Sequence, residues 1–360
     1  MMACRDGVFG LLIAAVGGTL FLVPAHGSAQ RFYSRPDRPD PCSGAVIRQS
    51  PLDGLIRCAE HGYAPDQYTL GVIYANGVMV VEDDAEAVRW FRMAAEQGHP
   101  LAQHNLGLMY AEGDGIPEDD AEAVRWFRMA AEEGYSPAQG SLGVMYDNGN
   151  GVPEDNAEAI RWYRLSAERG FAEAQYNLGV MYESGEGVPE DDGEATRWYR
   201  LSAERGFAAA QYNLGVMYSR GEGVPENDGE ALRWYWLAAG QGYALAQFNL
   251  GVMYSRGEGV PEDDAEAVGW YRLAAEQGDA LAQTNLGLMY ANGHGVPEDL
   301  VFAYMWFNLS AAQGNETAQR NNEKIEQQMT RGQIVEAQRL SREWIETPPP
   351  PRTGATELER

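Results

Sequence analysis

One motif recurs along this chain at a fixed spacing of 36 residues. Leu-Gly-x-x-Tyr begins at seven positions, namely Leu70, Leu106, Leu142, Leu178, Leu214, Leu250 and Leu286. A second motif, Trp followed by Phe or Tyr, keeps the same spacing from Trp90 to Trp306, without insertion or deletion. A fixed period of this length is typical of stacked repeats, in which no unit can bury its own apolar face alone. The sequence therefore predicts a solenoid.

Each unit is predicted to begin with an amphipathic helix. In the second copy one face of a 3.6-residue period is formed by Ala102, Leu106, Met109 and Tyr110. Gly113 and Gly115 follow, and glycine adopts the positive φ that ends a helix at little steric cost. Pro117 then prevents the helix from continuing.

A second helix is predicted to start at Asp119, whose carboxylate can cap free backbone amides. Glu122 stands three residues later, as in a reciprocal capping box. Gly134 closes the unit. The inward stripe of this helix, with Trp126 beside it, consists of Ala123, Phe127, Ala130 and Ala131.

The string A-x-x-x-L-G-x-x-Y-x-x-G-x-G-V-P-E-D-x-x-x-A-x-x-W-Y-x-x-A-A-x-x-G resembles the Sel-one-like repeat, a relative of the TPR repeat. It covers residues 63–314 as seven copies. The resemblance implies an all-α, right-handed α-solenoid of stacked helix-turn-helix repeats with terminal capping helices. It also implies use as an adaptor or scaffold in protein complexes.

Residues 1–29 have the pattern of a signal peptide. Arg5 precedes an uncharged apolar run over residues 8–23, and small residues end at Ala29. Cleavage after Ala29 would place the protein in a periplasm or outside the cell. The alternative is a retained anchor, although the run is short for a membrane span.

Residues 30–50 are rich in proline and are predicted to be an extended lead-in, followed by an N-terminal cap helix over 51–62. Cys58 stands where all seven repeats have Ala or Ser, so we expect it to face inward. After export only Cys42 and Cys58 would remain, and an oxidising compartment favours a disulfide between them. Two unpaired thiols are the alternative.

The C-terminal end is predicted to be a polar cap. Residues 315–346 are predicted to form cap helices: 315–329 resemble a first helix without its motif, and Thr330 and Gln333 stand as a capping pair at the start of the next segment. Residues 347–360 contain four consecutive prolines and are expected to form a disordered tail.

The formal net charge of −26 argues against nucleic-acid partners and against attraction to an anionic membrane. Nothing in the sequence indicates a cofactor, and no two histidines are spaced for a metal site. Some cysteine-rich members of the family are associated with β-lactamase activity, for which a Ser-x-x-Lys pair is a common requirement. The only lysine, Lys324, is preceded at −3 by Asn321, so we predict that the protein is not an enzyme.

Carboxylates gather in the turn before each second helix, as in Glu118, Asp119, Asp120 and Glu122. They can cap the helix and complement its dipole. Alternatively, they form an acidic stripe that attracts a basic partner or divalent cations. Two arginine series follow in the second helices and predict a solvated face with weak cross-repeat ion pairs: Arg89, Arg125, Arg161, Arg197 and Arg233, and then Arg92, Arg128, Arg164, Arg200 and Arg272.

One first-helix position varies between copies and is often aromatic. His104 occupies it in the second copy, and the candidate partner-binding residues at this position are Tyr68, Tyr176, Tyr212 and Phe248. These rings either line the concave groove or fill the seam between neighbouring repeats. Trp236 replaces an arginine of the second series, and an exposed Trp is a candidate hot spot.

The preferred hypothesis is an exported scaffold that binds a protein or peptide through the concave face. The alternative is a carbohydrate-binding or envelope and exopolysaccharide assembly factor, because aromatic rings also stack on sugars. A hydrolase is the third and least favoured possibility.

Overall fold

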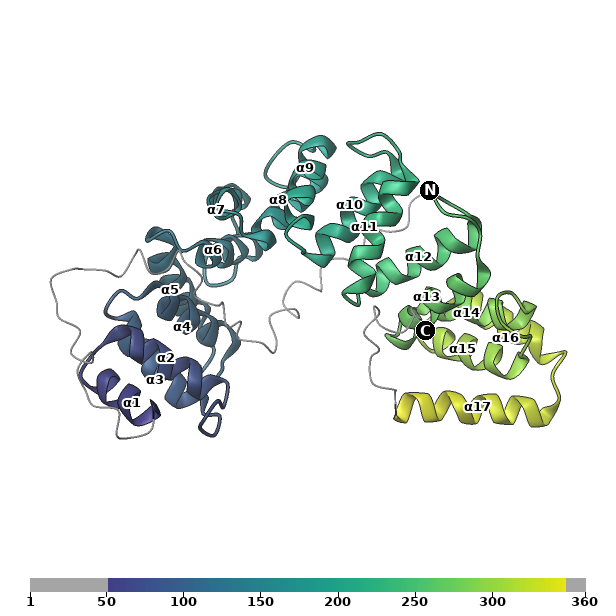
Figure 1. Cartoon of the computed structure of the whole chain (residues 1–360), viewed down its shortest axis with the longest axis horizontal. Helices are drawn as coiled ribbons and strands as arrows, with labels where there is room; N and C mark the ends of the chain where they lie inside the picture. The colour runs from purple at the N-terminus through teal and green to yellow at the C-terminus, as the bar shows by residue number, and fades with distance from the viewer. Residues whose placement is uncertain (1–50, 348–360) are drawn as a thin grey trace. The chain divides into compact units, whose positions relative to one another are not determined.

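The computed structural model describes residues 51–347, which form seventeen α-helices and no β-strand (Figure 1). The predicted signal peptide, the lead-in with Cys42 and almost all of the predicted tail lie outside the described residues. Consecutive helices pack as hairpins, one pair in each repeat, so the predicted all-α solenoid of stacked pairs is confirmed. We call the two members of each pair the first helix and the second helix.

The chain divides into two compact units, the first ending at Trp162 and the second beginning at Tyr163. This boundary falls inside α7 (Asn156–Glu168). The first unit contains α1 (Pro51–Glu60), α2 (Ala64–Ala75), α3 (Asp84–Ala95), α4 (Pro100–Glu112), α5 (Asp120–Glu132) and α6 (Ser136–Asn148). The second contains α8 (Ala172–Ser184), α9 (Asp192–Ala203), α10 (Ala208–Arg220), α11 (Asp228–Gly240), α12 (Ala244–Arg256), α13 (Asp264–Glu276), α14 (Ala280–Asn292), α15 (Leu300–Ala312), α16 (Glu316–Glu326) and α17 (Arg331–Glu346).

Helix termini follow the predicted residues, with one correction. The Asp119 carboxylate accepts a hydrogen bond of 3.1 Å from the backbone N–H of Glu122, and Gly113 ends α4 with φ of 77°. The predicted reciprocal bond from Glu122 is wrong, because the backbone N–H of Asp119 donates to the carbonyl oxygen of Tyr110 at 2.9 Å. The Glu122 carboxylate pairs instead with Arg125 at 2.8 Å, three residues along the same helix.

The Leu-Gly motif allows the two helices of a repeat to approach closely. A Cβ atom at Gly107 would lie 2.6 Å from the ring of Phe127, so no larger residue fits there. Leu106 is fully buried, and Phe127 is almost fully buried. Trp126 packs into the core cluster of the preceding repeat, so these two neighbouring repeats share buried side chains.

The second glycine of each turn lies against the preceding repeat. At Gly223, whose φ is 67°, a Cβ atom would lie 2.0 Å from the carbonyl oxygen of Asp192 at the start of α9. Gly151 and Gly295 have the same relation to Asp120 and Asp264. Because backbone meets backbone at this contact, each turn fixes its own repeat against the one before it.

Helix α17 covers α15 at the C-terminal end of the second unit. Trp344 meets Trp306 edge to face at 4.9 Å, and Asn308 donates a hydrogen bond of 3.4 Å to the Ser341 hydroxyl. The capping box predicted for Thr330 and Gln333 is present and confirmed.

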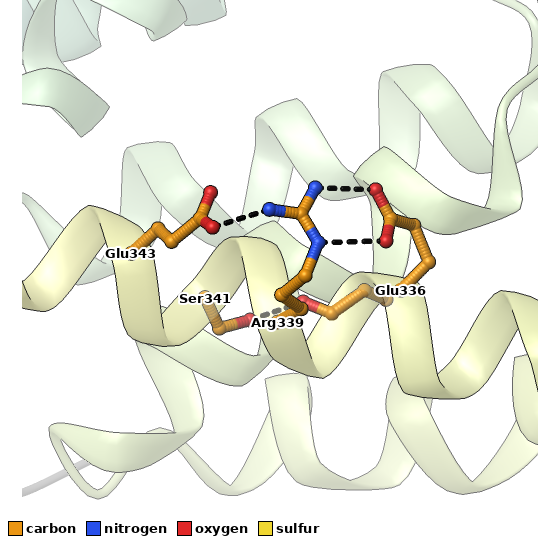
Figure 2. Close-up of polar contacts among 5 residues, drawn as sticks. Glu336, Arg339, Ser341 and Glu343 are labelled. Carbon is orange, nitrogen blue, oxygen red and sulfur yellow. Dashed lines mark hydrogen bonds and ion pairs between the residues drawn. The ribbon is translucent and has the colours of Figure 1, made fainter.

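The exposed side of α17 carries charges that pair with each other. Figure 2 shows Arg339 between Glu336, which it contacts through two nitrogens, and Glu343. This polar surface is what an array needs at its last helix, where no further repeat follows.

Candidate protein-interaction surface

The first helices α10, α12 and α14 each leave one narrow stripe uncovered. Its members stand at i, i+4, i+7 and i+11, which is one line along an α-helix. We call these positions the first-helix stripe. They are Ala209, Asn213, Val216 and Arg220 on α10, Leu245, Asn249, Val252 and Arg256 on α12, and Leu281, Asn285, Leu288 and Asn292 on α14; all twelve side chains are exposed or half-buried. On α8, the other first helix of the second unit, the stripe is interrupted by Asn177, which is buried.

The predicted aromatic residues lie beside this stripe with their rings packed between neighbouring helices. Tyr176 contacts the ring of Tyr199 at 5.7 Å and that of Phe207 at 5.2 Å. Tyr212 repeats the arrangement one repeat later with Tyr235 and Tyr243, at 5.9 and 5.2 Å. The rings are half-buried, and burial also reaches their hydroxyl groups, because it raises the pKa of both Tyr176 and Tyr212.

The other two aromatic candidates follow the same pattern. Phe248 packs against Tyr271 at 6.0 Å. In the first unit Tyr68 packs against Phe91 and stacks on His99 with ring centroids 4.9 Å apart. Of the two arrangements expected for these aromatic residues, this packing corresponds to the one in which the rings fill the seam between neighbouring repeats.

Asparagines of the first-helix stripe stand next to the tyrosine hydroxyls. Burial raises the pKa of Tyr176 to about 12, and a hydrogen bond with the Asn213 side chain partly offsets that effect. Burial likewise raises the pKa of Tyr235 to about 12, with Ser219 and Asn249 among the opposing hydrogen-bond partners. These hydroxyls therefore stay neutral around pH 7 and, like the amides, can both donate and accept hydrogen bonds.

Trp236 lies on α11, a second helix, and is not part of the first-helix stripe. Its side chain is 52% exposed. In five of the other six repeats an arginine at this position donates a cross-repeat hydrogen bond to a tyrosine hydroxyl, as Arg200 does to Tyr218 at 2.8 Å. Trp236 cannot make such a bond.

The arginines of the first series pair within their own helix. Arg197 binds Glu194 at 2.9 Å and also lies 4.7 Å from the ring centre of Trp198. The expected cross-repeat ion pairs are therefore wrong for this series, because a carboxylate three residues away on the same helix is nearer. The acidic turns supply these partners and the helix caps.

Other candidate groups have structural roles in the described chain. Cys58 is disulfide-bonded, while its predicted partner Cys42 lies outside the described residues, so that pairing stays a prediction. His99 caps α4 through Nδ1, and His104 is 3.1 Å from the Ser141 hydroxyl. Among residues 51–347 no group of three or more His, Cys, Asp and Glu side chains is arranged to hold a metal ion.

No described helix combines the length and the apolar character needed to span a bilayer.

The sequence patterns did not identify the charged and apolar residues at the two ends of the stripe as candidate binding residues. Arg220, Arg256 and Leu281 occupy positions that hold other residue types in most repeats, and all three are exposed. The available signal was this departure from the repeat pattern at positions that lie on the open line of the helix.

The helical hairpins, the core clusters shared between neighbouring repeats and the open first-helix stripe define an α-helical repeat protein of the solenoid class. The model of the Sel1 repeat matches seven consecutive segments, namely 64–99, 100–135, 136–171, 172–207, 208–243, 244–279 and 280–315. The chain belongs to the Sel1 repeat family, the Sel-one-like repeat that its motif resembles. This family is a non-catalytic repeat fold that generally serves as a scaffold for protein interactions.

Two solved structures are similar to this chain. A Sel1 repeat protein from Oxalobacter formigenes is 37% identical, with 76% of this chain and 79% of that chain covered and a TM-score of 0.63. A protective antigen present in uropathogenic Escherichia coli strains, which displays an SLR fold, is 32% identical over 82% of this chain and 87% of that chain, with a TM-score of 0.48. No curated protein matches the chain.

Proposed function

We propose that this protein is an exported scaffold that binds an extended segment of a partner protein along the first-helix stripe of its second unit. One observation carries the proposal. Half-buried stripe amides, Asn213 and Asn249, recur on successive first helices, and each is hydrogen-bonded to a tyrosine hydroxyl, that of Tyr176 or Tyr212, which holds it in place. An extended peptide presents backbone donors and acceptors at regular intervals, and such a row can pair with them.

The ring packing bears on the carbohydrate alternative. Sugar recognition by stacking needs an open aromatic face, whereas the rings of Tyr176 and Tyr212 each contact two other rings. No contact among the described residues favours a sugar over a peptide.

The test removes only hydroxyl groups. The double variant Tyr176→Phe and Tyr212→Phe keeps both rings, and the full chain serves as bait in an envelope extract. We expect it to recover the partner poorly compared with the unmodified protein. The matched control is Tyr218→Phe with Tyr290→Phe, whose hydroxyls accept bonds from Arg200 and Arg272 of the second helices. Equal loss of the partner in both double variants would contradict the proposal.

Export is supported by the pattern of residues 1–29 and by the disulfide at Cys58, since disulfides persist in oxidising compartments. N-terminal mass spectrometry of the protein from separated cell fractions tests this part. The expected mature chain begins at Gln30 and is found in the periplasm or the medium. A chain that keeps Met1 in the cytoplasmic fraction would exclude export.

A further inference from the structure

The last position of the first-helix stripe carries a positive charge only in repeats five and six. Across the seven repeats the residues are Asn76, Glu112, Asn148, Ser184, Arg220, Arg256 and Asn292. The side chains of Arg220 and Arg256 are 64% and 65% exposed, and their nearest carboxylates, on Glu222 and Glu258, are 3.7 and 3.5 Å away. The second-helix pairs are tighter, as in Arg125 with Glu122 at 2.8 Å. These two guanidinium groups can therefore accept a further carboxylate.

Exposed leucines occupy the first stripe position in repeats six and seven and the third stripe position in repeat seven. Leu245 on α12 and Leu281 on α14 are 43% and 55% exposed, and Leu288 lies further along α14. The two helices share one core, because Phe248 of α12 packs against the cluster that contains Leu286 of α14. Leu245 and Leu281 stand at the end of the stripe opposite the arginine position, and Leu288 stands four residues before that position. Three exposed leucines on two neighbouring helices are more than scattered surface residues.

The two ends of the stripe are separated by eleven residues of helix. At about 1.5 Å per residue this is about 16 Å. An extended peptide advances about 3.3 Å per residue, so about five residues cover the distance. A ligand that uses both ends needs its acidic and apolar side chains about five residues apart.

We infer that the first-helix stripe of repeats five to seven binds a partner segment that carries carboxylates at one end and leucine-like side chains at the other. Arg220 and Arg256 take the carboxylates, Leu245 and Leu281 take apolar side chains at the other end, and Leu288 takes an apolar side chain between the two ends. This inference rests on the proposed function and names the chemistry of the partner. The net charge of −26 disfavours non-specific approach of an acidic peptide, so any preference for acid must come from local cations.

The probes are synthetic peptides of about twelve residues, labelled with a fluorophore and titrated with the full chain in an anisotropy assay. One peptide places two Glu about five residues from three Leu. A second replaces Glu by Lys, and a third replaces Leu by Ser. We expect the first to bind about tenfold more tightly than either of the others, since both ends contribute.

Two double variants distinguish the effect of the arginines in the stripe from the effect of the protein's net charge. Arg220→Glu with Arg256→Glu should weaken binding of the first peptide about tenfold, because two attractions become repulsions. Arg197→Glu with Arg233→Glu makes the same change in net charge on second helices of the same unit, and should change binding less than about twofold. Thermal melts of both double variants check that each is folded.

Three results would overturn the inference: equal or tighter binding of the Lys peptide, an equal effect of the two double variants, or no binding of any peptide. If the Tyr176→Phe and Tyr212→Phe variant still loses its partner in that case, the proposed function stands and only this chemistry fails. If that variant also keeps its partner, the proposed function fails as well.

Discussion

Replacing Gly223 by Ala tests whether the turns fix the repeats against one another. Two costs apply at this position. An alanine held at φ of 67° adopts the left-handed conformation, which costs about 1–2 kcal/mol. Its Cβ would also lie 2.0 Å from the Asp192 carbonyl oxygen, and forced overpacking of this kind costs about 1–3 kcal/mol. We expect a total loss of about 2–5 kcal/mol.

Gly242 is the matched control for conformational strain alone. Its φ is 87°, but a Cβ atom there would meet nothing within 4 Å, so Gly242→Ala should cost only about 1–2 kcal/mol. Gly259, where the contact distance would be 2.7 Å, should fall between the two. Urea unfolding followed by circular dichroism measures all three variants on the full chain. If Gly223→Ala and Gly242→Ala lose the same stability, the turn contact does not hold the repeats together.

The remaining predictions concern caps, a buried amide and acid. Asp191→Ala removes a helix cap and should cost about 0.5–2 kcal/mol, whereas Asp192→Ala should cost much less; equal melting shifts would contradict the capping role. Glu133→Gln should gain about 0.5–1.5 kcal/mol in urea unfolding, because it supplies a donor to the buried, unpartnered Oε1 of Gln103; an unchanged midpoint would refute this. Burial lowers the pKa of His104 to about 4, so between pH 6.5 and 4 the unfolded chain binds more protons than the folded chain. The stability of the fold therefore decreases as the pH is lowered through this range. His104→Phe should reduce the loss of stability between melts at pH 7 and pH 4.5, and an identical loss would disprove this.

The Glu133 prediction follows from a difference among the repeats. In the first repeat Gln97 donates to the Oε1 of Gln67 at 2.6 Å, and the same bond recurs in the last three repeats. The second repeat has Glu133 at the donor position, and an ionised carboxylate cannot donate. Glu132→Gln, one residue earlier and exposed, is the control for the change in charge alone.

The sequence by itself determined the helix pairs and their stacking. Glycines such as Gly113, caps such as Asp119 and the apolar period around Leu106 act within a few residues of their own positions. Local interactions of this kind are readable from residue type and spacing. An exact 36-residue repetition then favours the same packing between each repeat and the next.

Only the tertiary structure decided which groups compete for one partner and which remain open. Glu122 had two possible partners, the backbone amide of Asp119 and Arg125, and the first is occupied by the carbonyl oxygen of Tyr110 on the preceding helix. Tyr176 could have faced a groove or a seam, and its surroundings come from Tyr199 and Phe207, which are 23 and 31 residues away along the chain. The exposure of Arg220 and Leu281 likewise depends on what the neighbouring helices leave uncovered. These outcomes depend on contacts between separate helices, and a one-dimensional pattern does not contain those distances.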